Sequence, residues 1–173
     1  MSQRTHKREQ FQQEKPSRNK LLLPLGGIAM ALIAVTGWLL LTPATGNHQV
    51  VAPGPDGTLR FSVNDFSDGQ ARFYRYQARD GAIDFFIVKS HDGVIRTAFD
   101  SCDVCFRERK GYRQEGREMV CVNCEQRFPT EKVNVVKGGC NPAPLKRQQL
   151  GGQVVIAAND IERGANYFPG SVN

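Results

Sequence analysis

The sequence predicts a mainly β domain, built from short antiparallel strands and a cysteine-rich ribbon, that follows one N-terminal membrane-spanning helix. Three observations predict this fold: an uncharged apolar run at residues 21–41, alternating apolar segments separated by turn motifs from residue 59 onward, and five cysteines confined to residues 102–140. With 173 residues in all, the chain has room for the predicted span and one modest globular domain.

The apolar run at residues 21–41 matches the ~20 residues that a helix needs to cross the hydrocarbon core of a bilayer. A cleaved signal peptide is the alternative, but the run is longer than the roughly 7–15 residues of a signal core. Residues 1–20 hold six lysines and arginines against two glutamates, whereas residues 42–59 hold no lysine or arginine. We therefore expect a basic cytoplasmic tail at residues 1–20 and a single-pass anchor in the inner membrane, with the following domain in the bacterial periplasm.

The charge distribution does not indicate nucleic-acid binding. The formal net charge is +6, but most of the excess lies in residues 1–20, and the rest of the chain is nearly balanced. The basic tail instead suits a membrane whose surface carries anionic lipid.

Residues 42–58 are rich in Pro, Gly and Thr and predict a flexible linker, in which His48 is expected to be solvated. The exported β-rich domain is predicted to cover residues 59–173. Alternating patterns predict strands over 58–66, 70–78, 82–90, 94–100 and 151–158, the first four as an antiparallel meander. A short helix is predicted within 159–168, capped at Asn159 and stopped by Gly164. The expected core residues are Phe61, Val63, Phe73, Tyr76, Phe85, Ile87, Val94 and Ile95.

Two Cys-x2-Cys pairs, Cys102 with Cys105 and Cys121 with Cys124, are separated by 15 residues, near the spacing of metal-binding ribbons. Each pair can turn two thiolates toward one point, and a hairpin with its turn at residues 115–116 can bring the pairs together. Structural zinc, an iron site and periplasmic disulfides all remain open on this spacing. No phosphate loop or hydrolase motif is present, which favours a metal-binding or electron-transfer protein over an enzyme.

Cys140 is the fifth cysteine and lies in the stretch KGGCNPAPL. The two glycines before it permit close backbone approach, so this loop could bring a fifth sulfur over the site. Asp100 and Asp103 flank the first cysteine pair, where they are expected to cap a turn rather than to orient thiolates.

The region from Phe85 to Leu145 resembles the FtrD-like membrane iron-sulfur proteins. The resemblance rests on the patterns DxCxxC, KGY, CxNCxxRF and GGCNPxPL, which this chain carries as DSCDVC, KGY, CVNCEQRF and GGCNPAPL. It implies that Cys102, Cys105, Cys121 and Cys124 bind an iron-sulfur cluster or iron, with Cys140 as a candidate fifth ligand. It also implies an association with bacterial iron transport, near an iron permease and periplasmic metal-binding proteins.

The predicted function is therefore that of a membrane-anchored metal-thiolate protein that transfers electrons or handles iron for a transport system. The resemblance implies that its metal site is of the iron-sulfur type. The alternative is a non-redox adaptor domain stabilised by a structural zinc ribbon. A third hypothesis is a copper or thiol-disulfide carrier that uses Cys140 and Met119.

Overall fold

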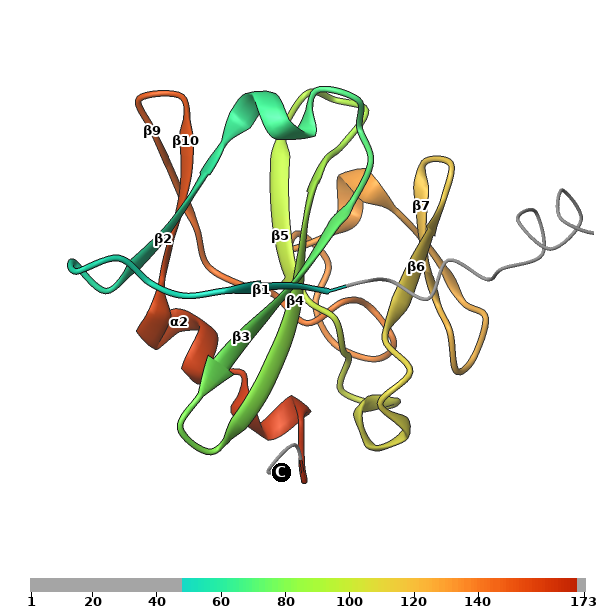
Figure 1. The fold of residues 1–173 in the computed structure, drawn as a ribbon. Coiled ribbons are helices and arrows are strands. Elements are labelled where there is room, and N and C mark those ends of the chain that lie inside the picture. The colour runs from blue at the N-terminus through green and yellow to red at the C-terminus, as the bar shows by residue number, and fades with distance from the viewer. Residues whose placement is uncertain (1–47, 171–173) are drawn as a thin grey trace, which may run out of the picture. The chain divides into compact units, whose positions relative to one another are not determined.

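The computed structural model describes residues 48–170 (Figure 1). Ten strands and several short helical turns make up this part. In chain order the strands are β1 (Gln49–Val51), β2 (Thr58–Ser62), β3 (Arg72–Ala78), β4 (Gly81–Lys89), β5 (Ile95–Phe99), β6 (Tyr112–Glu115), β7 (Glu118–Cys121), β8 (Arg127–Pro129), β9 (Gln148–Leu150) and β10 (Gln153–Ala157). The helical elements are α2 (Ala158–Glu162) and 3-10 turns at Val63–Phe66, Phe106–Glu108, Thr130–Lys132 and Ala165–Tyr167.

The central sheet has the strand order β1-β3-β4-β5. The pairs β3–β4 and β4–β5 are antiparallel, which confirms the predicted meander for these three strands, whereas β1 pairs with β3 in parallel. Two smaller antiparallel sheets have the orders β2-β10-β9 and β6-β7-β8. In Figure 1 the two smaller sheets lie on opposite sides of the central one.

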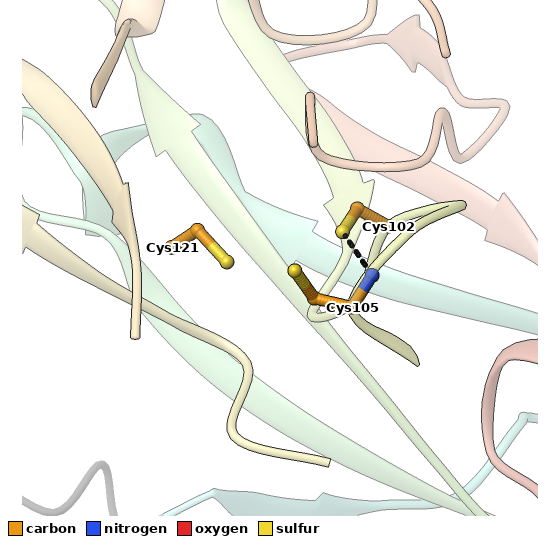
Figure 2. A group of neighbouring side chains, drawn as sticks. All are labelled: Cys102, Cys105 and Cys121. Atoms are coloured by element: carbon orange, nitrogen blue, oxygen red, sulfur yellow. Dashed lines mark hydrogen bonds between the residues drawn. The ribbon is translucent and has the colours of Figure 1, made fainter. Parts of the chain in front are cut away.

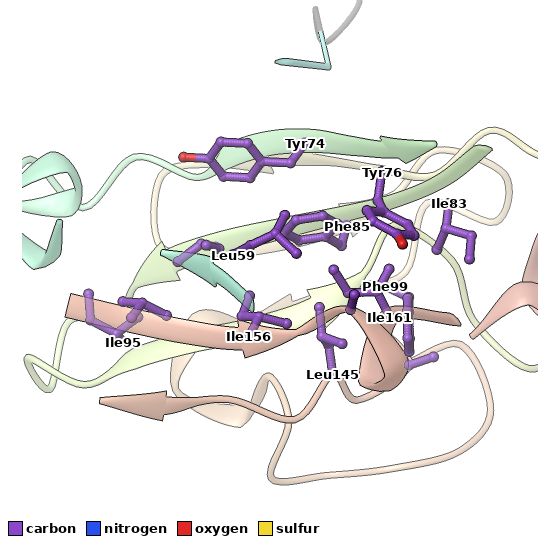
Figure 3. Packing of buried hydrophobic residues seen from close by; sticks show 14 of the residues in the cluster. Leu59, Tyr74, Tyr76, Ile83, Phe85, Ile95, Phe99, Leu145, Ile156 and Ile161 are labelled. Carbon is purple, nitrogen blue, oxygen red and sulfur yellow. The ribbon is translucent and has the colours of Figure 1, made fainter. Parts of the chain in front are cut away.

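Strand β4 is buried on both faces, because a different hydrophobic core packs against each. Phe85 and Ile87 point into a core shared with β2, β10 and α2, which Figure 3 shows from close by. Phe86 and Val88 point the other way, into a second core that includes Tyr112, Met119 and two of the cysteines. Side chains alternate across a strand, so neighbouring residues of β4 reach the two cores in turn.

The first predicted strand ends earlier than expected. We predicted a strand to residue 66, but β2 stops at Ser62, whose Oγ accepts a hydrogen bond from the Asn64 amide and so begins a 3-10 turn. Strand β2 then pairs with β10 rather than joining the meander. The prediction missed this pairing because the two strands are far apart in the sequence.

Two further expectations are corrected by the structure. Val94 is 42% exposed instead of lying in the core, because it ends the turn before β5 and accepts a hydrogen bond from the Ser90 amide. The C-terminal helix α2 ends at Glu162, before Gly164 as predicted, but its N-cap is Ala157 rather than Asn159, and no side chain caps it. A separate 3-10 turn follows it at Ala165–Tyr167.

Part of the segment predicted as a linker belongs to the central sheet. Residues 49–51 form β1, and their backbone pairs with residues 74–76 of β3. The predicted tail at 1–20 and the predicted span at 21–41 lie outside the described residues. Within residues 48–170, no helix has the length and apolar character that crossing a bilayer requires.

Candidate metal centre

The ribbon sheet β6-β7-β8 brings the two cysteine pairs together. The first pair follows the end of β5, and the second begins at Cys121, the last residue of β7. The predicted hairpin between the pairs is confirmed: β6 and β7 run antiparallel, and Gly116 in their turn has a φ of 60°. All five cysteines are in the described part of the chain, and each is a free thiol there.

The Sγ atoms of Cys102, Cys105 and Cys121 lie within 4.8 Å of one another. Figure 2 shows these three side chains, with Cys102 and Cys105 on one turn and Cys121 reaching toward them from the ribbon. Cys102 and Cys121 are buried, at 1% and 2% exposure. We call this group the inner triad.

A second set of thiols, which we call the outer triad, consists of Cys105, Cys124 and Cys140, again within 4.8 Å of one another. Cys140 reaches it from the loop after Gly138 and Gly139, both of which have positive φ. Its sulfur lies 3.8 Å from that of Cys105. All four predicted ligands and Cys140 thus occupy one region, and Cys105 belongs to both triads.

Backbone amides point at several of the sulfurs. The Cys105 amide donates to Cys102 Sγ at 3.2 Å, as drawn in Figure 2. Burial raises the pKa of Cys121 to about 12, although the amides of Asn123 and Cys124 donate to its sulfur and act in the opposite direction. A metal ion that binds this thiolate must therefore displace a proton, and the amides then stabilise the charged sulfur.

The thiols of the outer triad differ in their pKa values. Burial raises the pKa of Cys140, and contacts with Cys124 and Cys105 raise it further. Burial also acts to raise the pKa of Cys124, but a hydrogen bond from the Gln126 amide and contacts with neighbouring thiols outweigh it and lower the pKa. Cys124 is therefore the more readily deprotonated of these two ligand candidates.

Tyr112 joins the ribbon to the loop that carries Cys140. Its hydroxyl donates to the Cys140 carbonyl at 2.6 Å, and its amide donates to Oδ1 of Asp100 at 2.7 Å. Its ring lies in the second core, 6.2 Å from the ring of Phe86. The KGY motif is visible in the sequence, but this orienting role is not, because nothing in the local pattern shows that the tyrosine is buried.

Asp100 is buried, and its role differs from the simple turn cap that we expected. Besides the Tyr112 amide, it contacts His48, with 3.0 Å between His48 Nε2 and Asp100 Oδ2. The expectation that His48 is solvated is therefore wrong: strand β1 begins at the next residue and holds the imidazole against the sheet, where Phe73 packs on it. Asp103 accepts a hydrogen bond from the Tyr167 hydroxyl, 64 residues along the chain.

The contact between His48 and Asp100 predicts a pH-dependent contribution to stability. The hydrogen bond with Asp100 raises the pKa of His48 against the opposing effect of burial, and Asp84, whose Oδ2 is 3.8 Å away, raises it further. Arg75, which pairs with Asp84, acts to lower it. Because the pKa of His48 is higher in the folded state than in the unfolded state, the contact stabilises the fold fully at pH values below the unfolded-state pKa of about 6.5. This stabilisation is lost as the pH rises through the folded-state pKa of His48.

We expect His48→Gln to remove this pH dependence. Denaturant midpoints of the variant and the parent protein, measured from about pH 5.5 to about pH 9, should differ most at the acidic end and converge at the basic end. His91→Gln is the matched control, because His91 is exposed in a turn. A stability difference between His48→Gln and the parent that stays constant across the range would contradict the assignment.

The donor set fits a thiophilic metal. A tetrahedral centre with metal–sulfur bonds of about 2.3 Å places its sulfurs about 3.8 Å apart, and the sulfurs of Cys105 and Cys140 already have that separation. Thiolates suit zinc and iron-sulfur centres alike. The fold and this site define a small, mainly β domain whose clustered cysteines can hold a metal.

Comparison with known families identifies the group to which this domain belongs. Residues 66–168 match the family described as "Membrane iron-sulfur containing protein FtrD-like". The chain therefore belongs to the FtrD-like family, as the motifs between residues 85 and 145 predicted. No curated protein and no solved structure matches the chain.

Proposed function

We propose that the thiol site holds iron, as an iron-sulfur cluster or as iron bound by thiolates alone, and that it transfers electrons or handles iron for a bacterial iron-transport system. The observation that carries the proposal is the convergence of five free thiols, from two turns and a separate loop, on one region. The family's description as iron-sulfur containing supports iron over other thiophilic metals.

The surroundings of the site suit a centre that exchanges electrons or metal with a partner. Amides donate to the sulfurs, and hydrogen bonds of this kind, together with solvent exposure, set the reduction potential of thiolate-bound iron. Cys124 is exposed, so one edge of the site is open to an approaching molecule. The metal would supply the redox or transfer chemistry, while the chain would position and protect its thiolate ligands.

A structural zinc site is the second candidate. The inner triad favours it, because two of its three cysteines are buried within the second core, as ligands of closed structural sites are. In that case the domain would act as a non-redox adaptor. The exposed Cys124 and the additional Cys140 are what the zinc hypothesis explains less well.

Location and partners form part of the proposal. We propose that residues 21–41 anchor the chain in the inner membrane and that the β domain faces the periplasm. The proposed partners there are an iron permease and periplasmic metal-binding proteins. The family's description as a membrane protein supports the anchor, and the basic residues of the N-terminal tail support the orientation.

The test is to purify the full chain in detergent without oxygen, record its visible spectrum and measure iron, zinc and acid-labile sulfide. We expect a coloured, iron-containing protein that bleaches on reduction. Cys121→Ser should lose the colour and the iron, whereas the control Val104→Ser, in an exposed position of the first turn, should keep both. A colourless, redox-silent protein loaded with zinc would replace the iron proposal with the structural one.

A further inference from the structure

A pocket with a basic lining lies where the segments on either side of the Cys140 loop, residues 133–137 and 144–147, meet the start of β5. Its volume is about 540 Å³. Its cationic lining residues are Arg96, Lys137, Lys146 and Arg147. No aspartate or glutamate of residues 48–170 lines it. We call it the basic pocket.

Most of the positive charge in the basic pocket has no carboxylate partner. Arg96 pairs with Asp92 at 2.7 Å. In the described part of the chain, by contrast, Lys137, Lys146 and Arg147 form no ion pair. The fold therefore leaves an excess of positive charge at this surface, and such an excess attracts anionic molecules.

Arg147 is held in place but keeps free donors. Its Nε donates to the Ile95 carbonyl at 2.6 Å, and its two terminal nitrogens make no hydrogen bond to any of residues 48–170. Burial lowers the pKa of Arg147, and the nearby charge of Arg96 lowers it further. A carboxylate on the open side of the Arg147 guanidinium could accept two hydrogen bonds and would offset the repulsion between the two arginines.

Apolar side chains lie beside these cations. Val94 and Val135 line the basic pocket and are 42% and 61% exposed, and the next residue, Val136, is 42% exposed. A small inorganic anion would leave these valines in water, whereas a protein segment with acidic and apolar side chains would cover them. No Trp, Tyr or Phe of the described residues lines the pocket, although these are the usual anchors at a lipid surface.

We propose that the basic pocket is the docking surface for an acidic segment of a partner protein. Carboxylates of that segment pair with Lys137, Lys146 and Arg147. An apolar side chain next to them packs against Val94 and Val135. Interfaces of this charged kind speed the encounter of two proteins, and small ones also release quickly, as an exchange partner must.

The position of the basic pocket connects docking to the thiol site. Its two lining segments lead into and out of the loop that carries Cys140. Val133 lines the pocket and also packs in the second core with Cys102 and Cys121. A partner bound here therefore contacts both sides of the Cys140 loop. The inference rests on the proposed function only for the purpose of docking, because the binding itself requires no metal.

The experiment uses the full chain, isotope-labelled for NMR, in nanodiscs of zwitterionic phosphatidylcholine. The probe is a short synthetic peptide of Asp, Glu and Leu, and the control peptide has Asn and Gln in place of the acids. We expect the acidic peptide alone to shift the amide signals of Val135, Lys146 and Arg147. Its affinity should fall as the salt concentration rises from about 0.05 M to about 0.5 M.

Charge-reversal variants assign the binding to the basic pocket. Lys137→Glu combined with Lys146→Glu should weaken peptide binding about tenfold or more. Both side chains are exposed, so this variant is expected to fold and to keep the metal content of the parent protein. Arg79→Glu combined with Arg117→Glu is the matched control, because both arginines are exposed and neither lines the pocket. The control should keep the affinity of the parent protein.

The outcomes separate this inference from the proposed function. Equal affinities in the two double variants, or signal shifts only outside the basic pocket, would overturn the inference. Shifts that need phosphatidylglycerol in the nanodisc instead of the acidic peptide would assign the surface to anionic lipid and overturn it as well. Peptide binding at the pocket by a colourless, zinc-loaded parent protein would support the inference and contradict the proposed iron site alone.

Discussion

Replacing Gly111 by alanine should destabilise the domain by about 3 kcal/mol or more and disturb the thiol site at the same time. Gly111 has a φ of +64°, a region that alanine adopts only with strain. A Cβ at this position would also lie 2.6 Å from Cγ of the buried Asp100 carboxylate. That carboxylate accepts the Tyr112 amide, so its displacement would loosen the tyrosine that holds the Cys140 loop.

Gly116→Ala separates the two causes of destabilisation, which are the backbone strain and the clash with Asp100. Gly116 has nearly the same φ, +60°, but a Cβ there would meet no atom within 4 Å. We expect it to cost only the backbone strain, about 1 kcal/mol, and to leave the metal content unchanged. Denaturant unfolding and metal analysis of both variants give the comparison. Equal losses of stability in the two variants would show that the clash with Asp100 does not contribute to the destabilisation.

The second large effect is expected in strand β4, where adjacent phenylalanines serve different cores. Phe85→Ala and Phe86→Ala should each lower the free energy of unfolding by about 3–5 kcal/mol, because both side chains are fully buried. Phe86 packs near Tyr112 in the core that holds the cysteines, whereas Phe85 packs with the core around β2 and β10. Only the change at Phe86 should weaken metal binding.

Metal affinity and unfolding of the two variants are the measurements, and Phe85→Leu and Phe86→Leu provide milder changes if the alanine variants do not fold. We expect Phe85→Ala and Phe86→Ala to have similar stability but different metal affinity. Similar affinity losses in both variants would mean that metal binding responds to global stability rather than to the packing beneath the thiols.

Local patterns predicted much of the fold. Alternation and Asp-Gly turns placed β3, β4 and β5 within about two residues of their ends, because these strands pair with their chain neighbours. The pairing of β2 with β10 and of β1 with β3 was not predictable in this way. Both depend on contacts between distant segments, and local periodicity carries no information about them.

At the candidate site, too, local patterns predicted some features, whereas features that depend on contacts between distant segments were missed. The Cys-x2-Cys spacing predicted the two turns and the hairpin between them, and the glycines before Cys140 predicted its approach. His48 was missed because it lies in a Pro- and Gly-rich stretch, 52 residues before the carboxylate that it contacts. The shared position of Cys105 was also missed, since spacing indicates which cysteines pair along the chain but not how the pairs overlap in space.

These cysteines are proposed to hold metal as thiolates instead of linking the fold as disulfides. X-ray absorption at the metal edge of the full chain, purified in detergent without oxygen, tests it most directly. The structure predicts a first shell of sulfur atoms at about 2.3 Å from the metal. A first shell of nitrogen or oxygen without sulfur, or cysteines recovered as disulfides from the same sample, would contradict it.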